Sequence, residues 1–183
     1  AQRLDATPSV IGAWATVDLE NIHIAAGDVA MSLGTGLIMG TSSGLSRSPA
    51  DVIGNADNAL TMRPWTSSSQ VGSIRGLVIR APIPSTGIEV LASIGRSTLN
   101  DLSEMIYACA ITRDFSVASL TLSAVSTQQH SFHSLTATKN IGNGILRSEL
   151  AVDQSLKWSG HLQGQYHLAR TELGFSLGAM MWT

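Results

Sequence analysis

The residues that most resemble an enzyme motif are Gly40-Thr41-Ser42-Ser43-Gly44, which match the Gly-x-Ser-x-Gly pattern of a hydrolase nucleophile elbow. That elbow holds its serine in a strained turn between a strand and a helix of a parallel sheet, and Asp and His follow later in the chain. Here the motif begins a Ser- and Gly-rich stretch, and no alternation of strands and helices surrounds it. We therefore expect Ser42 to be a loop residue and the chain not to be an enzyme.

Histidine and cysteine are the side chains that most often bind transition metals. His130 and His133 lie three residues apart in a polar segment, with no third ligand near them in the sequence. His161 and His167 share one face of a predicted strand, but about 20 Å would separate them. Cys109 is the only cysteine, so neither an intrachain disulfide nor a paired-thiolate zinc site is possible. We expect no metal site and no cofactor.

Charge and composition restrict the class of protein further. The net charge is -2, which gives no reason to expect a nucleic-acid groove. Only 13% of residues are charged and 44% are hydrophobic, whereas soluble domains usually carry about 25% charged residues. No stretch approaches the roughly 20 apolar residues of a membrane helix. Few charges without such a helix are typical of a membrane β-barrel, in which lipid-facing and interior-facing residues alternate.

Alternation of apolar and polar residues with a period of two predicts strands along most of the chain. It is clearest at residues 118–124, where Leu120 and Leu122 alternate with serine and threonine. The connection Ala169-Arg170 fits a tight hairpin between two such runs. The pattern predicts about nine strands of roughly 8 to 12 residues, long enough to cross a bilayer when tilted. Their ranges are 10–18, 22–33, 72–81, 88–97, 105–113, 118–124, 145–153, 161–168 and 172–179.

Two segments interrupt this pattern. Residues 40–70 are rich in Ser, Gly, Asn and Asp and predict one long loop, which is unusual in a compact soluble domain but common on one side of a barrel. Residues 127–144 predict either a loop or a loop with one irregular strand. The expected fold is all-β, an antiparallel up-and-down transmembrane β-barrel or part of one, formed by residues 1–183 as a single domain.

In such a barrel the polar rows of the strands would face the interior. These rows supply eight candidate lumen-facing residues, which are Arg147, Glu149, Asp153, His161, Gln163, Gln165, His167 and Glu172. Three further charges, Asp28, Arg63 and Arg75, could form an ion-pair cluster that pins the long loop inside the barrel. None of these residues implies a catalytic function.

The segment from Gly12 to Gly76 contains a more specific series of motifs. In order they are Gly27-Asp28, Gly34-Thr35-Gly36-Leu37, a Ser- and Gly-rich loop, Arg63-Pro64-Trp65-Thr66-Ser67 and Arg75-Gly76. This segment resembles the β-barrel region of large bacterial outer-membrane proteins, best known from Bacteroidota-like lineages, that join a helix-hairpin-helix module to a barrel. That family usually has Gln, Tyr and Glu where this chain has Thr35, Trp65 and Gln70.

The resemblance implies a fragment or shortened relative that lacks the helix-hairpin-helix part. It implies an outer-membrane segment with a role in passage or anchoring, in contact with outer-membrane lipid and with other parts of a longer barrel chain. No nucleic acid is expected to bind these residues, and no small-molecule ligand is identifiable. The alternative is a secreted or periplasmic soluble β-sandwich or barrel that binds a partner, because periodicity does not distinguish inward-facing from outward-facing apolar rows.

Overall fold

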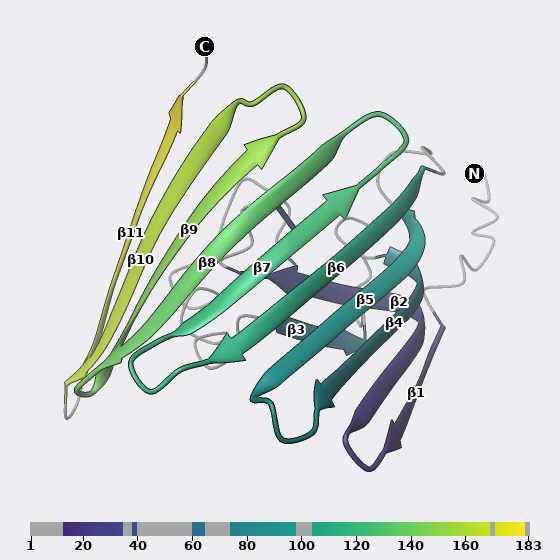
Figure 1. Cartoon of the computed structure of the whole chain (residues 1–183), viewed down its shortest axis with the longest axis horizontal. Coiled ribbons are helices and arrows are strands. Elements are labelled where there is room, and N and C mark those ends of the chain that lie inside the picture. Colours follow the sequence, from purple (N-terminus) through teal and green to yellow (C-terminus); the bar gives the residue numbers. More distant parts are fainter. Residues whose placement is uncertain are drawn as a thin grey trace, which may run out of the picture.

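A computed structural model of the chain describes residues 13–34, 38–39, 60–64, 74–97, 104–168 and 171–181. These residues form one antiparallel sheet of eleven strands (Figure 1). Within the described ranges, no helix has the length and the apolar character needed to cross a membrane. The prediction of an all-β antiparallel fold is therefore confirmed.

The strands vary in length from five to twelve residues. Their bounds are β1 (Trp14–Leu19), β2 (Ile22–Leu33), β3 (Leu60–Pro64), β4 (Ile74–Ile83), β5 (Ile88–Ser97), β6 (Met105–Asp114), β7 (Ser119–Ser126), β8 (Ser131–Ile141), β9 (Gly144–Asp153), β10 (Trp158–Leu168) and β11 (Thr171–Met181).

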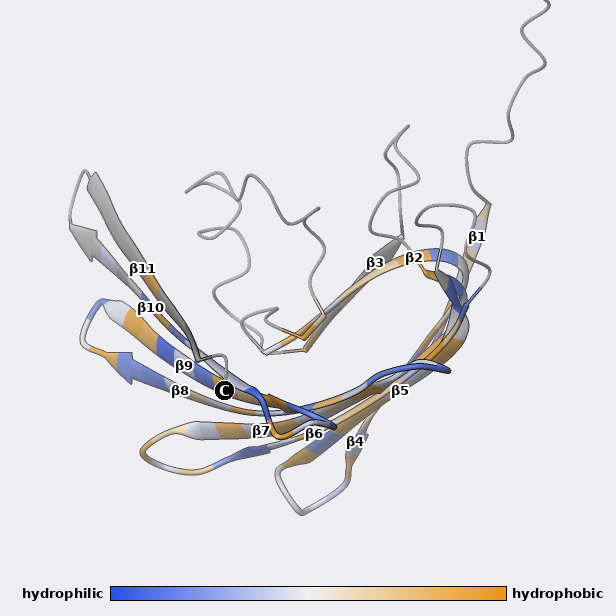
Figure 2. Ribbon diagram, turned by 90° about the horizontal axis from the view of Figure 1, so that it is seen from above, coloured by the Kyte–Doolittle hydropathy of each residue, from blue (hydrophilic) through white to orange (hydrophobic). Residues whose placement is uncertain are grey.

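The sheet is a meander. Its order is β1-β2-β4-β5-β6-β7-β8-β9-β10-β11, and β3 pairs only with β2, outside this series. Seen from above, the sheet curves into an open trough, with β3 on the concave side (Figure 2). β1 and β11 lie at the two ends of the order and do not pair with each other among the described strands. The predicted closure into a barrel is thus not present in this part of the chain.

Connections at the two ends of the strands differ in length. At one end, here called the turn end, the strands are joined by residues 20–21, 84–87, 115–118, 142–143 and 169–170. Gly87 and Gly142 have positive φ angles of 67° and 58°, which short hairpin turns need and glycine adopts without strain. At the other end, the loop end, the strands are joined by residues 65–73, 98–104, 127–130 and 154–157, whereas the connection after β2 begins at Gly34, next to Thr136 and Glu149 on the concave face.

Two strands lie outside the nine predicted ranges. β8 lies in the segment 127–144, where a loop or an irregular strand was expected, yet it pairs regularly along both edges. Its outward row contains His133 and Lys139 beside Leu135, which weakens the apolar alternation. β3 lies inside the predicted 40–70 loop, and its five residues are too short to show a period. The rest of that loop, including Ser42, is outside the described residues.

The strands β7 to β9 have their leucines on the exposed face. In β7, Leu122 is 61% exposed whereas Thr121 is 1% exposed. In β9, Leu150 is 54% exposed and its neighbour Glu149 only 3%. Leu122, Leu135 and Leu150 are consecutive cross-strand partners, so they form one row on the convex face. The alternation predicted from the sequence is present here, with its apolar side outward.

The first half of the sheet departs from the expectation that apolar rows face outward. Residues 29–33 of β2 pair with β3, and β2 leaves β4 after Val29, so that this hairpin lies over the concave face (Figure 2). Its apolar side chains pack against inward-facing residues of β4 to β7. The resulting buried cluster contains Ala25, Val29, Met31, Leu33, Leu60, Ile74, Val78, Leu91, Ala108, Ala110 and Val125.

We predict that Leu91→Ala destabilises the fold by about 2–5 kcal/mol, because Leu91 is fully buried and its truncation leaves a cavity. Leu135→Ala, the matched truncation on the convex face, should cost about 1 kcal/mol or less, since the surroundings fill the space. Urea titration of both variants in one detergent measures the difference. Equal losses of stability would show that Leu135 is packed as tightly as the core residue.

Candidate functional site

The concave face of β7 to β10 carries a continuous group of polar side chains, which we call the polar wall. Its strand register places Thr121 beside Thr136, and Ser123 beside Ser134. Glu149 pairs with both Thr136 and His161. The members of the polar wall are Thr121, Ser123, Ser134, Thr136, Arg147, Glu149, His161 and Gln163, and all except the half-buried His161 are buried.

Hydrogen bonds satisfy only part of the polar wall. The Arg147 Nε–H donates to Thr138 Oγ1 at 3.3 Å, and the Thr121 hydroxyl bonds that of Thr112 at 2.9 Å. The buried hydroxyls of Ser123, Ser134 and Thr136 have no hydrogen-bond partner in the part of the chain that the structure describes. A buried hydroxyl without a partner is costly, so these groups indicate a surface suited to polar contacts.

Four of the eight predicted interior residues belong to this wall, namely Arg147, Glu149, His161 and Gln163. Asp153 lies instead at the end of β9, where its Oδ1 accepts the backbone N–H groups of Ser155 and Lys157 at 2.8 and 2.9 Å and so stabilises the turn. For Gln165, His167 and Glu172 the backbone register is described, with His167 opposite Glu172, but the side chains lie outside the described residues.

The predicted charge cluster is present in part. Arg75 donates from Nε and Nη2 to the two carboxylate oxygens of Asp28, at 2.8 and 3.0 Å. Asp28 also accepts the N–H of Ala13, at 3.2 Å. Arg63 lies opposite Ala30 in β3, and its side chain is outside the described residues.

The position of this ion pair differs from the expected one. In β4, Ile74 and Val78 point to the concave face. Arg75 therefore points to the convex face, together with the exposed Leu77 and Ile79. The pair links β2 to β4 and the residue before β1 on the outer side of the sheet. It is therefore not inside the trough, and its role in holding the long loop stays a prediction.

A second ion pair was not predicted. Arg80 donates from Nε and Nη2 to Glu89 at 2.7 and 3.0 Å, across the β4–β5 hairpin. Both residues occupy inward-facing positions near the turn end. The signal available in the sequence was their placement on either side of the predicted turn at residues 82–87, with opposite charges on the same strand face.

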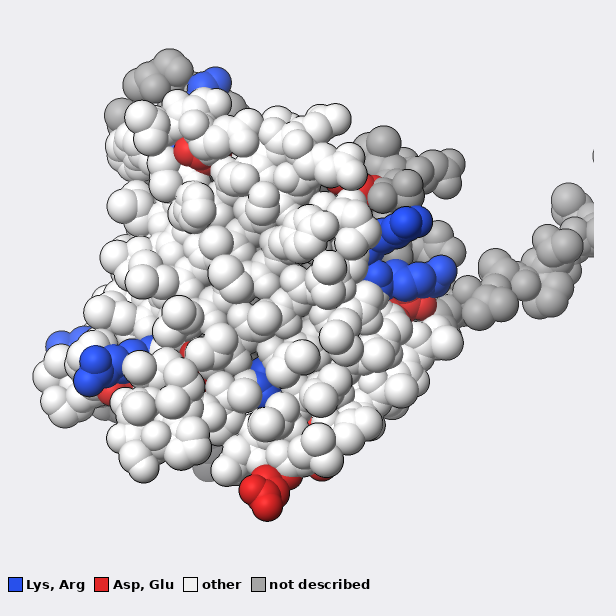
Figure 3. All heavy atoms as spheres, turned by 45° about the vertical axis from the view of Figure 1, so that its right-hand side comes forward, with Lys and Arg blue, Asp and Glu red and all other residues white. Residues whose placement is uncertain are grey.

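The convex face is apolar in its middle and charged at its margins. Its exposed apolar residues are Leu77, Ile79, Ile94, Ile111, Leu120, Leu122, Leu135, Leu150 and Leu177. Outward-facing cations lie near the strand ends: Arg75 and Arg96 at the loop end, Arg113 and Lys139 at the turn end. A space-filling view shows a broad area free of charged side chains, with most charges near its edges (Figure 3).

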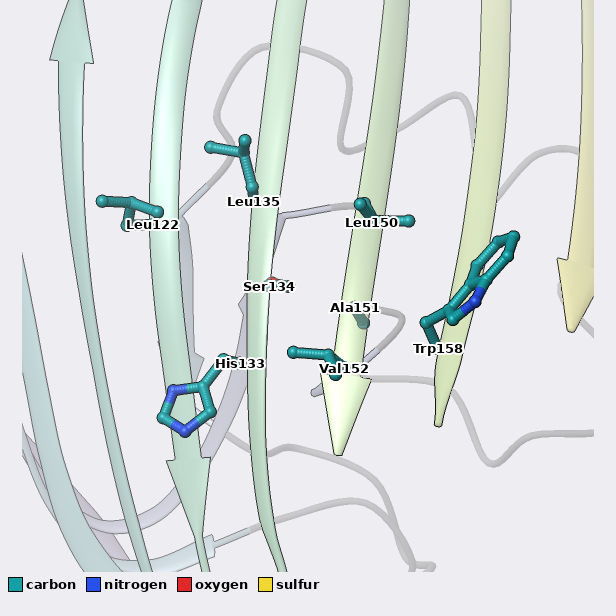
Figure 4. Close-up of a pocket in the computed structure, with 8 residues that line it drawn as sticks. All are labelled: Leu122, His133, Ser134, Leu135, Leu150, Ala151, Val152 and Trp158. Carbon is teal, nitrogen blue, oxygen red and sulfur yellow. The ribbon is translucent and has the colours of Figure 1, made fainter. Parts of the chain in front are cut away.

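A groove of about 550 Å³ crosses the convex face over β7 to β10 (Figure 4). Leu122, Leu135 and Leu150 line one side, and His133, Val152 and Trp158 line the other. The surface of the groove is almost entirely apolar.

Other candidate chemistry finds no support. Among the described residues, no group of three or more His, Cys, Asp or Glu side chains is arranged to hold a metal ion. His133 is exposed on the convex face. His130 lies in the turn before β8, and its ring contacts that of Phe132 in the strand. Cys109 is an exposed free thiol on the same convex face.

Comparisons of the chain with known protein families, with curated proteins and with solved structures found no match. The resemblance to outer-membrane proteins with a helix-hairpin-helix module therefore stays a prediction that rests on its motifs alone.

We predict that Arg75→Gln destabilises the fold by about 1–2 kcal/mol, because the Asp28 carboxylate would lose its cationic partner while 4% exposed. The cost is below that of a fully buried pair, since the Arg75 side chain is 60% exposed. Arg96→Gln is the matched control, because Arg96 is exposed directly opposite Arg75, and it should change stability by no more than about 0.5 kcal/mol. Urea denaturation measures the stability of both variants. Equal losses of stability would show that the Asp28–Arg75 pair does not stabilise the fold.

Proposed function

We propose that the chain is a segment of an outer-membrane β-barrel, with its convex face in lipid and its concave face around a polar interior. The observation that carries this proposal is the inverted alternation of β7 to β9, where leucines are exposed and hydroxyl or charged side chains are buried. A membrane barrel requires this arrangement, because hydrocarbon surrounds its outer face.

The soluble alternative fits this observation poorly. A water-soluble sandwich or barrel would turn Leu122, Leu135 and Leu150 inward and leave Thr136 and Glu149 in water. The opposite placement would leave a large apolar patch in contact with water, together with the cost of buried polar groups. In a membrane the same patch is favourable.

The size of the apolar belt also supports the proposal. On β10 the outward-facing aromatic residues Trp158 and Tyr166 are 40% and 45% exposed. They lie eight positions apart (166 − 158 = 8), a distance of about 26 Å along a strand at roughly 3.3 Å per residue. A tilt of about 40° reduces this to about 20 Å across a bilayer, close to the roughly 25 Å band between aromatic girdles.

The ends of the strands supply an orientation. Membrane barrels of bacteria have short turns on the periplasmic side and longer loops outside the cell. By that rule the turn end, which includes Gly87 and Gly142, faces the periplasm. The loop end faces outward, and Arg75 and Arg96 lie at the headgroup level on that side.

The open edges of the sheet identify further partners. β1 and β11 each have one edge that no described strand occupies, and in lipid those backbone groups must be hydrogen-bonded. We infer that further strands of a longer barrel chain pair with these edges. The role of the complete barrel is passage of a solute or anchoring at the outer membrane.

A charge placed on the convex face tests the proposal. In the complete barrel chain that contains this segment, Leu135→Arg should weaken folding into dilauroyl-phosphatidylcholine vesicles by about 2–4 kcal/mol, because Leu135 lies in the middle of the apolar belt. Leu156→Arg is the matched control in the β9–β10 turn, where Leu156 is 79% exposed, and it should cost less than about 1 kcal/mol. Urea titration in vesicles measures both.

The two classes of function give opposite results. If the sheet kept the present structure in water, Leu135 would be an exposed surface residue, and its replacement by Arg would be tolerated or would improve solubility. Monomeric protein that stays folded in plain buffer with Leu135→Arg would contradict the membrane assignment.

A further inference from the structure

We propose that Arg75 and Arg96 form a site on the convex face for the phosphate of an anionic membrane lipid, whose acyl chain lies along Leu77, Ile94 and Ile79. This inference rests on the proposed barrel and adds to it a specific lipid partner. Three observations support it: the two arginines are directly opposed, their charges face outward, and an exposed apolar track begins beside them.

The strand register places the two arginines side by side. Arg75 of β4 is the direct cross-strand partner of Arg96 of β5. Both side chains point to the convex face, and both are exposed. Directly opposed residues of an antiparallel pair have Cβ atoms about 4.5–5.5 Å apart, and like charges at that spacing destabilise the pair. An anion bound between the two guanidinium groups would remove this repulsion.

Asp28 does not fill that position. It lies on β2, on the side of Arg75 that is away from β5, where it accepts from Nε and Nη2 of Arg75. The Asp28 side chain is 4% exposed and that of Arg75 is 60% exposed, so the cation faces outward and the carboxylate does not. Arg96 has no ion-pair partner among the residues that the structure describes. Asp28 therefore orients Arg75 and leaves the space beside Arg96 available.

A phosphate fits this arrangement chemically. The planar guanidinium group binds phosphate oxygens through two parallel N–H donors, and two such groups can hold one phosphate from both sides. The outward cations at the turn end are arranged differently. Arg113 lies on β6 and Lys139 on β8, so β7 separates them, and the Arg113 guanidinium lies 5.1 Å from the centre of the Phe115 ring. The opposed pair is thus the better anion site on this face.

An apolar track extends from the two arginines toward the turn end. Leu77 and Ile94 are the next outward-facing pair, and Ile79 follows on β4; all three are exposed. Arg75 and Ile79 are four positions apart, a distance of about 13 Å at roughly 3.3 Å per residue. The hydrocarbon of one leaflet is about 15 Å thick, half of a core of about 30 Å. The track therefore fits an acyl chain that continues from a bound phosphate.

Tyr107 completes the surroundings of the site. It lies on β6 opposite Ile94, faces outward and is exposed. An amphipathic ring of this kind is typical of the headgroup level of a membrane protein. The site thus combines cations and an aromatic ring near the loop end with hydrocarbon contacts below them, which favours a lipid over a soluble phosphate.

Lipid selectivity beside the arginines tests the site. The complete barrel chain would carry Ile79→Cys, labelled with bimane, as its only thiol, with Cys109→Ser in the same protein. In dilauroyl-phosphatidylcholine vesicles, quenching by nitroxide-labelled phosphatidic acid is compared with quenching by nitroxide-labelled phosphatidylcholine of the same chains. We expect an approximately fivefold preference for phosphatidic acid, the factor that one arginine contributes near an anionic headgroup.

Arg96→Gln should remove most of this preference, because a single guanidinium group paired with Asp28 would remain. Arg113→Gln is the matched control, since it removes the same charge from the same face at the opposite end of the strands. It should leave the preference unchanged. The urea midpoint of each variant in vesicles checks that all of them are folded.

The folded parent without a preference, or equal losses in both variants, would overturn the site and leave only a diffuse attraction by surface charge. Excess glycerol phosphate should not reduce quenching by phosphatidic acid, and displacement would mean that the arginines take soluble phosphate instead of a lipid. Each of these results would leave the barrel proposal intact. Failure of the parent chain to fold into vesicles would contradict the barrel itself.

Discussion

Successive side chains of a strand point to opposite faces of its sheet, and in β7 to β9 those faces carry opposite kinds of residue. Leu122, Leu135 and Leu150 form an exposed row, while Thr121, Thr136 and Glu149 are buried on the other side. In water this arrangement would be unfavourable on both faces. The proposed position in a membrane and the proposed polar interior both depend on it.

The hairpin explains why the two halves of the sheet differ. Where β2 and β3 cover the concave face, the strands beneath them have apolar residues on both faces. In β4, for example, Val78 is buried under the hairpin and Leu77 is exposed on the convex face. Where only the tip at Gly34 reaches the wall, the inward residues are hydroxyl-bearing or charged. One irregular element thus divides the concave face into an apolar half that packs against the hairpin and a polar half.

The sequence predicted the regular part of this structure well. Period-two alternation located nine of the strands and placed Arg147, Glu149 and Gln163 on the inner face, because these features depend only on local order along a strand. It did not predict the hairpin, since the buried cluster that contains Leu33, Leu60 and Leu91 joins residues far apart in the chain. The close contact of Gly34 with Thr136 could not be predicted either, because the sequence does not distinguish a glycine that permits close packing from any other loop glycine. The Asp28–Arg75 pair was anticipated from charge alone, but its face was not, since that depends on the register of β2 with β4.

The most direct test of the central claim is a measurement of which face of the sheet contacts lipid. Spin labels placed one at a time from position 119 to 126 of β7, in protein folded into vesicles, report contact with lipid-soluble oxygen or with a water-soluble nickel chelate. We expect oxygen accessibility to peak at positions 120, 122 and 124 and to fall at 121 and 123. Preferential accessibility of positions 120, 122 and 124 to the nickel chelate would place the leucine face in water and contradict the account.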